Sequence, residues 1–176
     1  MMTVNAILNR INYTGPRTPT LETLQGLMRQ YLYSVPFENL DIHLGRPIRM
    51  ELPHLFHKIV TQKRGGFCYE SNLLFHDLLL RLGFDVTILS ARMVFNGVVL
   101  PEFVHVTLLV KLDRPYLADV ANGQSFRQPL PLDGSVADHN EGRQYVLGQH
   151  EGHHALLLRE GDGPWTPRFL YTLTPR

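Results

Sequence analysis

The single cysteine of this chain lies in a setting that favours thiol chemistry. Cys68 follows two glycines and a basic pair in residues 63–68, Lys-Arg-Gly-Gly-Phe-Cys, and it opens a predicted helix. The amides at a helix N-terminus carry partial positive charge, which favours a thiolate. Glycines before it allow a sharp turn and close approach of a substrate to the backbone, whose N–H groups can hold an oxyanion. The competing interpretation is a buried structural cysteine.

A nucleophilic cysteine needs a base, and the base needs a group that orients it. Nine histidines are present, and His105 stands out because it interrupts an apolar segment, residues 104–110. Asp119 likewise interrupts an apolar strand, residues 116–120, where a carboxylate is costly without a partner. Taken alone, His105 could instead be a structural histidine in the core with its hydrogen bonds satisfied.

The two residues are predicted to meet on one face of a β-hairpin. If the turn is centred on Asp113, Asp119 pairs with Thr107 and faces the same side as His105. It is then a diagonal neighbour of His105 at roughly 7–8 Å between backbones, within reach of an imidazole. The sequence therefore predicts a Cys68–His105–Asp119 triad, in which geometry and not chain order defines the roles.

A second constellation competes with the triad. Residues 150–154, His-Glu-Gly-His-His, match H-E-x-x-H, which binds zinc when a helix places both histidines on one face. Gly148 and Gly152 are poor helix residues, and the flanking segments favour strands. We therefore predict a polar hairpin loop here and no metal site.

Two further polar residues are predicted to support the site. Glu38 is expected to pair with Arg64 and pin the loop before Cys68. Asn72, one helical turn after Cys68, is either a hydrogen-bonding partner of the site or an ordinary polar helix residue.

Helices are predicted in the first half of the chain and strands in the second. Apolar periodicity predicts helices over 20–34, 52–61 and 67–82, the last ending at Gly83. Strands are predicted over 86–95, 104–110 and 116–120, with Asn96-Gly97 as a hairpin turn, and weaker strand candidates over 144–147, 155–158 and 169–173. This order is typical of an α+β fold.

Composition narrows the class of protein. The chain has 176 residues, a net charge of +1 and 44% hydrophobic content, enough for a substantial core. The fourteen arginines and three lysines are dispersed, which argues against nucleic acid as the main partner. No apolar stretch reaches the roughly 20 residues of a membrane helix, and no secretory signal is recognisable. With one cysteine no intrachain disulfide can form, so we predict a cytoplasmic location. The oligomeric state is left open by the sequence.

The motifs together resemble the arylamine N-acetyltransferases over nearly the whole chain, from about residue 21 to 171. The resemblance is carried by Pro36-Phe37-Glu38-Asn39-Leu40-Asp41, Arg64-Gly65-Gly66-Phe67-Cys68-Tyr69-Glu70-x-Asn72, His105 in its apolar strand, and Tyr116-Leu117-Ala118-Asp119-Val120-Ala121-Asn122-Gly123.

The resemblance implies an N-terminal helical bundle (1–84) carrying the nucleophile, then an antiparallel β-barrel-like domain (85–176), around a cysteine-protease-like catalytic core. It implies that Cys68 is acetylated by acetyl-CoA, a co-substrate and not a resident cofactor, with His105 as base and Asp119 orienting it. The acetyl group then passes to an arylamine or hydrazine in a ping-pong reaction.

The resemblance also implies that Phe37 and Asn122 line the substrate pocket and that Gly123 contacts the cofactor.

The sequence departs from the family pattern in two places. Residues 121–123 read Ala-Asn-Gly where the family usually has Gly-Phe-Gly, and the family's third domain, a lid, is expected to be missing, which predicts reduced activity. Alternatives are an amide synthase, a thioester hydrolase of the same fold, or a catalytically weak binding protein without the lid.

Overall fold

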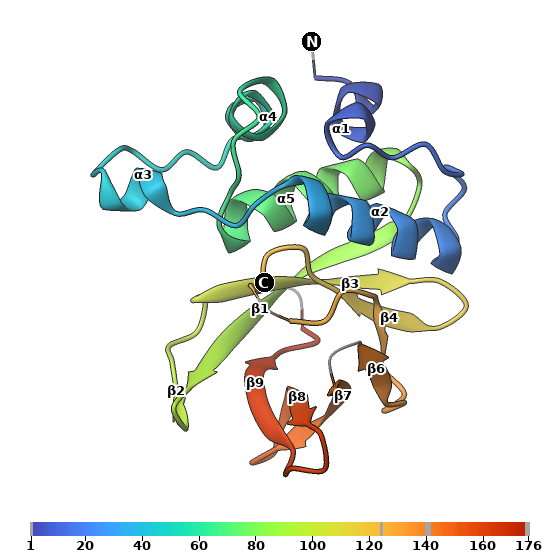
Figure 1. Ribbon diagram of the computed structural model, residues 1–176, viewed down its shortest axis with the longest axis vertical. Helices are drawn as coiled ribbons and strands as arrows, with labels where there is room; N and C mark the ends of the chain where they lie inside the picture. Colours follow the sequence, from blue (N-terminus) through green and yellow to red (C-terminus); the bar gives the residue numbers. More distant parts are fainter. Residues whose placement is uncertain (1, 124, 140–141, 175–176) are drawn as a thin grey trace.

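The computed structural model describes residues 2–123, 125–139 and 142–174, and its helices precede its strands. Figure 1 shows the helices on one side of the molecule and the later strands on the other. The helical elements in the described residues are α1 (Val4–Arg10), α2 (Leu21–Ser34), α3 (Leu40–His43), α4 (Leu52–Phe56), the π-helical turn η1 (His57–Thr61) and α5 (Cys68–Arg81). None of them is long and apolar enough to cross a membrane.

The three predicted helices are confirmed, with local causes at their ends. α2 begins after Thr20, whose hydroxyl accepts a hydrogen bond from the Thr23 amide at 3.3 Å. The predicted helix over 52–61 forms as α4 followed without a break by η1. α5 ends before Gly83, which has a φ of +86° and suits a helix C-terminus.

Two short helices escaped prediction. α1 has seven residues and begins with a Thr3 hydroxyl that accepts from the Ala6 amide. α3 has only four residues, and no side-chain hydrogen bond caps its N-terminus. Segments of one or two turns contain too few apolar repeats for a periodicity to emerge.

The strands form one antiparallel sheet in the order β5-β4-β3-β1-β9-β8-β7-β6, with β2 paired to β1. Because β5 also approaches β7, the sheet is nearly closed and barrel-like. The strands are β1 (Asp85–Phe95), β2 (Val98–Val99), β3 (His105–Lys111), β4 (Pro115–Ala118), β5 (Leu130–Pro131), β6 (Ala137–His139), β7 (Arg143–His150), β8 (His153–Glu160) and β9 (Thr166–Tyr171).

The predicted Asn96-Gly97 turn is confirmed. Both residues have positive φ, +51° and +76°, and the flanking Phe95 and Val98 pair across β1 and β2. Positive φ at both central residues is the requirement of the tight turn that suits twisted strands.

The helices cover the sheet through α5, which packs on β1 and β3. Tyr31 of α2 and Phe75 of α5 are fully buried, with an edge-on ring contact at 5.4 Å between centroids.

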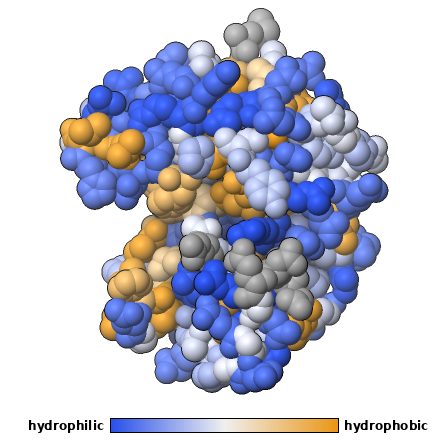
Figure 2. Space-filling view, viewed as in Figure 1, coloured by the Kyte–Doolittle hydropathy of each residue, from blue (hydrophilic) through white to orange (hydrophobic). Residues whose placement is uncertain are grey.

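On the face in Figure 2 the surface is hollowed between α3 and the β1–β2 hairpin. Figure 2 shows apolar surface on both sides of that hollow. The exposed apolar residues of the two segments include Leu40 and Leu44 at the ends of α3, and Phe95 and Val98 at the β1–β2 turn.

Candidate active site

The loop before Cys68 is fixed by backbone pairing with a distant segment. The Glu38 amide donates to the Gly66 carbonyl, and the Gly66 amide donates to the Pro36 carbonyl, both at 3.2 Å. A Cβ on Gly65 would lie 2.0 Å from the Pro36 carbonyl oxygen. Glycine at position 65 is therefore required by the close approach of two backbones.

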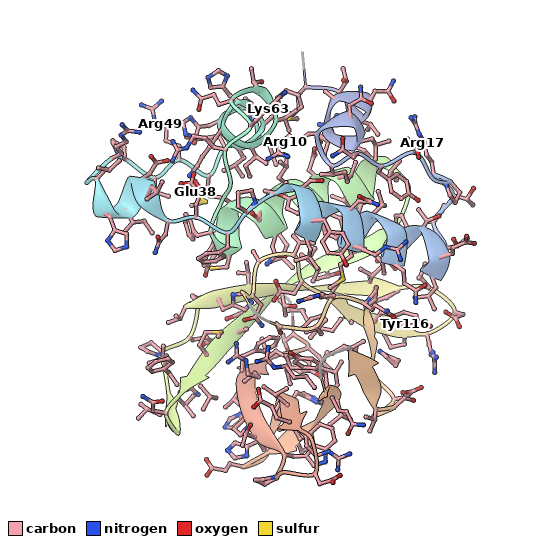
Figure 3. The ribbon with its side chains drawn as sticks, viewed as in Figure 1. Arg10, Arg17, Glu38, Arg49, Lys63 and Tyr116 are labelled. Atoms are coloured by element: carbon pink, nitrogen blue, oxygen red, sulfur yellow. The ribbon has the colours of Figure 1, made fainter. Side chains whose placement is uncertain are left out.

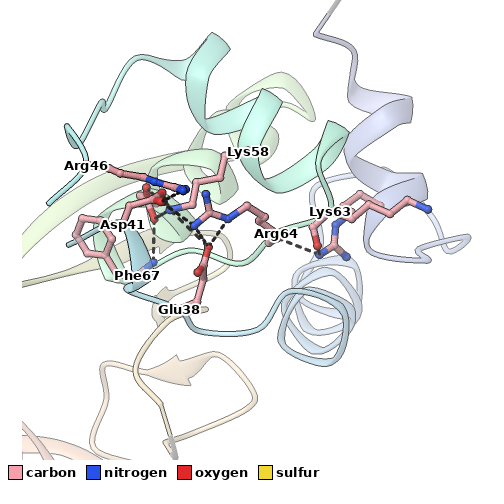
Figure 4. Close-up of polar contacts among 9 residues, drawn as sticks. Glu38, Asp41, Arg46, Lys58, Lys63, Arg64 and Phe67 are labelled. Carbon is pink, nitrogen blue, oxygen red and sulfur yellow. Dashed lines mark hydrogen bonds and ion pairs between the residues drawn. The ribbon is translucent and has the colours of Figure 1, made fainter. Parts of the chain in front are cut away.

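The predicted pair of Glu38 and Arg64 is confirmed, and it belongs to a larger buried ion cluster (Figure 4). Arg64 Nη2 lies 2.8 Å from Glu38 Oε1 and 3.0 Å from Asp41 Oδ1. Lys58 is only 2% exposed and donates to both oxygens of Glu70 at 2.8 Å, while its Nζ lies 2.9 Å from Asp41 Oδ2. A buried ammonium persists only with such compensation.

The cluster connects directly to the start of α5. Glu70 lies in the first helical turn, and its Oε2 also accepts from the Phe67 amide at 3.2 Å. Burial alone would raise the pKa of Asp41, but hydrogen bonds and charge from Lys58 and Arg64 outweigh it and lower that pKa to about 2. Burial opposes the charge of Lys58 as well, and Glu70 and Asp41 more than offset it, so the pKa of Lys58 is raised.

On the other side of the site, His105 and Asp119 form a short hydrogen bond. His105 Nε2 lies 2.6 Å from Asp119 Oδ2, and both residues are at most 3% exposed. The register pairs Leu108 with Ala118, so Asp119 stands one position further, opposite Thr107, as predicted. Because a carboxylate only accepts, Nε2 carries the proton, which leaves Nδ1 available to the thiol.

Asn72 is a hydrogen-bonding partner of the site. Its Nδ2 donates to Asp119 Oδ1 at 3.0 Å and to the Val106 carbonyl at 2.9 Å, while its Oδ1 accepts from the Val120 amide at 3.0 Å. The Ala121 amide donates to the same Asp119 oxygen at 2.9 Å. The Asp119 carboxylate is therefore held by a side chain of α5 and by the backbone of the loop that follows β4, in addition to its contact with His105.

Cys68 completes this arrangement from the first turn of α5. Burial opposes the imidazolium, but Asp119, with a smaller contribution from the hydrogen bond and charge of Cys68, raises the pKa of His105 well above its ordinary value. The Cys68 Sγ also lies 3.8 Å from the Val104 carbonyl oxygen. A half-buried thiol, an imidazole that favours its charged form and a buried carboxylate can support a thiolate–imidazolium pair.

Sequence reasoning missed the Asp41–Lys58–Glu70 part of the ion cluster and one contact beside Cys68. Tyr69, next to Cys68, donates its hydroxyl to the Phe103 carbonyl at 2.5 Å, and Phe103 has a φ of +66°. A bulky residue in this region is strained. The one sequence feature that could have indicated the cluster is the presence of acidic and basic residues inside apolar segments.

The residues expected to line a substrate pocket lie on the loops of the site. Phe37 is 52% exposed and is itself the residue paired with Gly66 in the β-bridge. Asn122 is buried, and its amide nitrogen has no hydrogen-bond partner in the described residues. Gly123 has a φ of +55°, with no other heavy atom near the position of a Cβ.

The H-E-x-x-H segment lies on a hairpin, as predicted. Glu151 and Gly152 have φ of +49° and +78° and form the turn between His150 and His153, which pair across β7 and β8. The helix that this zinc motif needs is not formed. Within residues 2–123, 125–139 and 142–174, no group of three or more histidine, cysteine or acidic side chains is placed to hold a metal ion.

Comparison with known proteins gives one consistent result. The family model described as N-acetyltransferase matches residues 20–176. The arylamine N-acetyltransferase of Mycolicibacterium smegmatis is 36% identical over 183 residues, covering 99% of this chain and 66% of the relative. That of Escherichia coli K12 is 34% identical, covering 94% of this chain and 56% of the relative.

Solved structures agree with this similarity. The arylamine N-acetyltransferase of Salmonella typhimurium superposes with a TM-score of 0.90 at 31% identity, covering 100% of this chain and 66% of that one. The Mycobacterium marinum arylamine N-acetyltransferase in complex with CoA gives 0.89 at 30% identity, covering 99% and 66%. The chain thus spans less than two thirds of the length of these relatives.

Proposed function

This chain belongs to the arylamine N-acetyltransferase family, and from that premise we propose that it transfers an acetyl group from acetyl-CoA to an arylamine or hydrazine through an acetyl-Cys68 intermediate. The observation that carries the proposal is the 2.6 Å contact of His105 Nε2 with Asp119 Oδ2, beside a cysteine at the start of α5. The proposal assigns Cys68 as nucleophile, His105 as acid and base, and Asp119 as the residue that orients His105.

In the first half-reaction the Cys68 thiolate attacks the carbonyl carbon of the acetyl thioester. The tetrahedral intermediate collapses, the bond to the CoA sulfur breaks, and the proton on His105 Nδ1 passes to the departing thiolate. Asp119 keeps the Nε2 proton in place throughout, because its own carboxylate is held by Asn72 and the Ala121 amide. The products are free CoA and acetyl-Cys68.

In the second half-reaction a neutral amine attacks the acetyl carbon. His105, now neutral at Nδ1, accepts the proton that the amine loses, and Cys68 leaves as a thiolate. Aromatic amines and hydrazines suit this step because they are largely unprotonated near pH 7. We place Phe37 and Asn122 in the acceptor pocket and Gly123 at the cofactor as part of the same proposal. A cytoplasmic location follows only from the single cysteine and stays a prediction.

The first test is intact-mass spectrometry after brief incubation with acetyl-CoA. We expect one acetyl group on the wild type and none on Cys68→Ser. We also expect Asp119→Asn to slow acetylation by at least 100-fold, because the orienting charge is lost. Addition of an arylamine should then discharge the acetyl-enzyme and yield the amide.

The matched control is Asp85→Asn, which neutralises an exposed carboxylate on β1 and should acetylate at the wild-type rate. Acetylation of Cys68→Ser to the wild-type extent would disprove the assigned nucleophile. Discharge by water at the same rate with and without amine would favour a thioester hydrolase instead.

A further inference from the structure

A cationic pocket of about 300 Å³ lies beside the ion cluster and is lined by residues of α3, α4, η1 and the segments that follow α3 and η1. Its lining includes Asp41 and Lys58 of the cluster. The side chains that give it its character are three arginines, two histidines and an amide: Arg46, Arg49, Arg64, His54, His57 and Gln62. Figure 3 shows Arg49 extending outward from the segment between α3 and α4.

The charges of this pocket are unequally compensated. Asp41 is its only carboxylate among the lining residues, against four cationic side chains. Lys58 contributes positive charge but no free N–H donor, because the three contacts of its ammonium group go to the two oxygens of Glu70 and to Asp41. Even with Glu38 and Glu70 of the cluster counted, one positive charge remains uncompensated.

Hydrogen-bond donors remain available on all three arginines. Arg46 uses only Nη1, at 3.3 Å from Asp41, and its side chain is 60% exposed. Arg64 bonds through Nε and Nη2, which leaves Nη1 without a partner in the described ranges. Arg49 forms no ion pair or hydrogen bond with any residue that the structure describes, and it is exposed.

We propose that this pocket binds a phosphate group carried by a small molecule or free in solution. Arginine forks match the oxygens of phosphate in paired hydrogen bonds, and imidazoles add further donors. A carboxylate offers only two oxygens, whereas phosphate offers three or more to donors that surround it. The volume of about 300 Å³ accommodates the phosphate group itself. Phosphate binding is inferred here from the lining of this pocket and not from the acetyl transfer proposed at Cys68.

The test is isothermal titration of the full chain with inorganic phosphate at pH 7.5, with ionic strength held constant by KCl. We expect saturable binding at one site. The double variant Arg49→Gln/His57→Gln should weaken it at least tenfold while keeping the wild-type melting temperature, because neither residue belongs to the ion cluster. Arg17→Gln removes an exposed arginine at the other end of the helical layer and should leave phosphate affinity unchanged.

Two results would overturn the proposal: no saturable heat with phosphate at constant ionic strength, or equal affinity in the double variant and the wild type. A competition experiment with CoA identifies the molecule that carries the phosphate, and both of its outcomes are consistent with a phosphate site. If CoA displaces phosphate from the wild type, the phosphate belongs to the acyl donor. If CoA binds without displacing it, the occupant is a separate phosphorylated metabolite or free phosphate.

Discussion

Asn72→Ala is expected to destabilise the protein and to change the reactivity of Cys68, because this side chain joins α5, which begins at Cys68, to Asp119 and to the loop that follows β4. Asn72 is fully buried, and truncation at Cβ removes three hydrogen bonds at 2.9–3.0 Å. It leaves the Val106 carbonyl and the Val120 amide buried without these partners. Asp119 keeps the Ala121 amide but loses its contact from α5.

The expected loss follows from the types of bond. Two of the bonds are between neutral groups, at about 1 kcal/mol each, and the bond to the Asp119 carboxylate adds about 2 kcal/mol. The free energy of unfolding should therefore fall by about 4 kcal/mol, measured by urea denaturation with the slope unchanged. Alkylation of Cys68 by iodoacetamide, followed against pH, should shift its profile, because Asp119 no longer holds His105 in one orientation.

Two further variants separate hydrogen bonding from packing. Asn9→Ala makes the same truncation at an exposed position of α1 and should cost less than about 0.5 kcal/mol. Asn72→Asp preserves the shape but places a carboxylate 3.0 Å from Asp119 Oδ1, so it should destabilise at least as much as alanine. Near wild-type stability of Asn72→Asp, or an unchanged alkylation profile in Asn72→Ala, would refute the reasoning.

Three more outcomes follow from the segment before α5. Lys58→Met should lower the free energy of unfolding by about 3–5 kcal/mol, because it leaves buried carboxylates unpaired; the exposed Lys63→Met is the control, and urea denaturation measures both. Gly65→Ala should lower the melting temperature sharply, because its Cβ would lie 2.0 Å from a carbonyl oxygen, whereas Gly148→Ala meets only a side-chain carbon at 3.3 Å. Since the pKa of Asp41 is lowered to about 2, its ionised carboxylate should contribute about 1–2 kcal/mol to the free energy of unfolding above pH 4, and this contribution should disappear as the pH falls toward 2. Denaturation of the wild type and of Asp41→Asn across this pH range checks the expectation.

The parts of the fold that are coded locally could be predicted from the sequence. The Thr20 cap, the Gly83 helix end and the Asn96-Gly97 turn each depend on residues within one or two turns of chain. The hairpin register was predictable for the same reason, since a turn centred on Asp113 determines which residue faces Asp119. The meeting of His105 and Asp119 follows from that register.

Contacts between distant segments could not be predicted in this way. Nothing in the sequence near β9 indicates that it pairs with β1, because that pairing joins residues about 80 positions apart and depends on closure of the barrel. Asp41 and Lys58 meet only after α3 and α4 have packed around the loop before Cys68. The pair of Glu38 and Arg64 was predicted because both lie in motifs already singled out, while Lys58 lies in an ordinary amphipathic helix.

These two kinds of contact position the two halves of the site by different physical means. The His105–Asp119 half is set by a hairpin register that every ladder hydrogen bond supports. The loop before Cys68 contains two consecutive glycines, so it has few side chains with which to pack, and its position depends on the backbone bridge to Pro36 and on the ion cluster. Burying such charges gains little stability over well-packed apolar residues, but ion pairs restrict geometry more tightly than apolar contacts do. Changes that keep every charge of the cluster paired should therefore alter Cys68 reactivity more than global stability, whereas changes in the hairpin should alter both together.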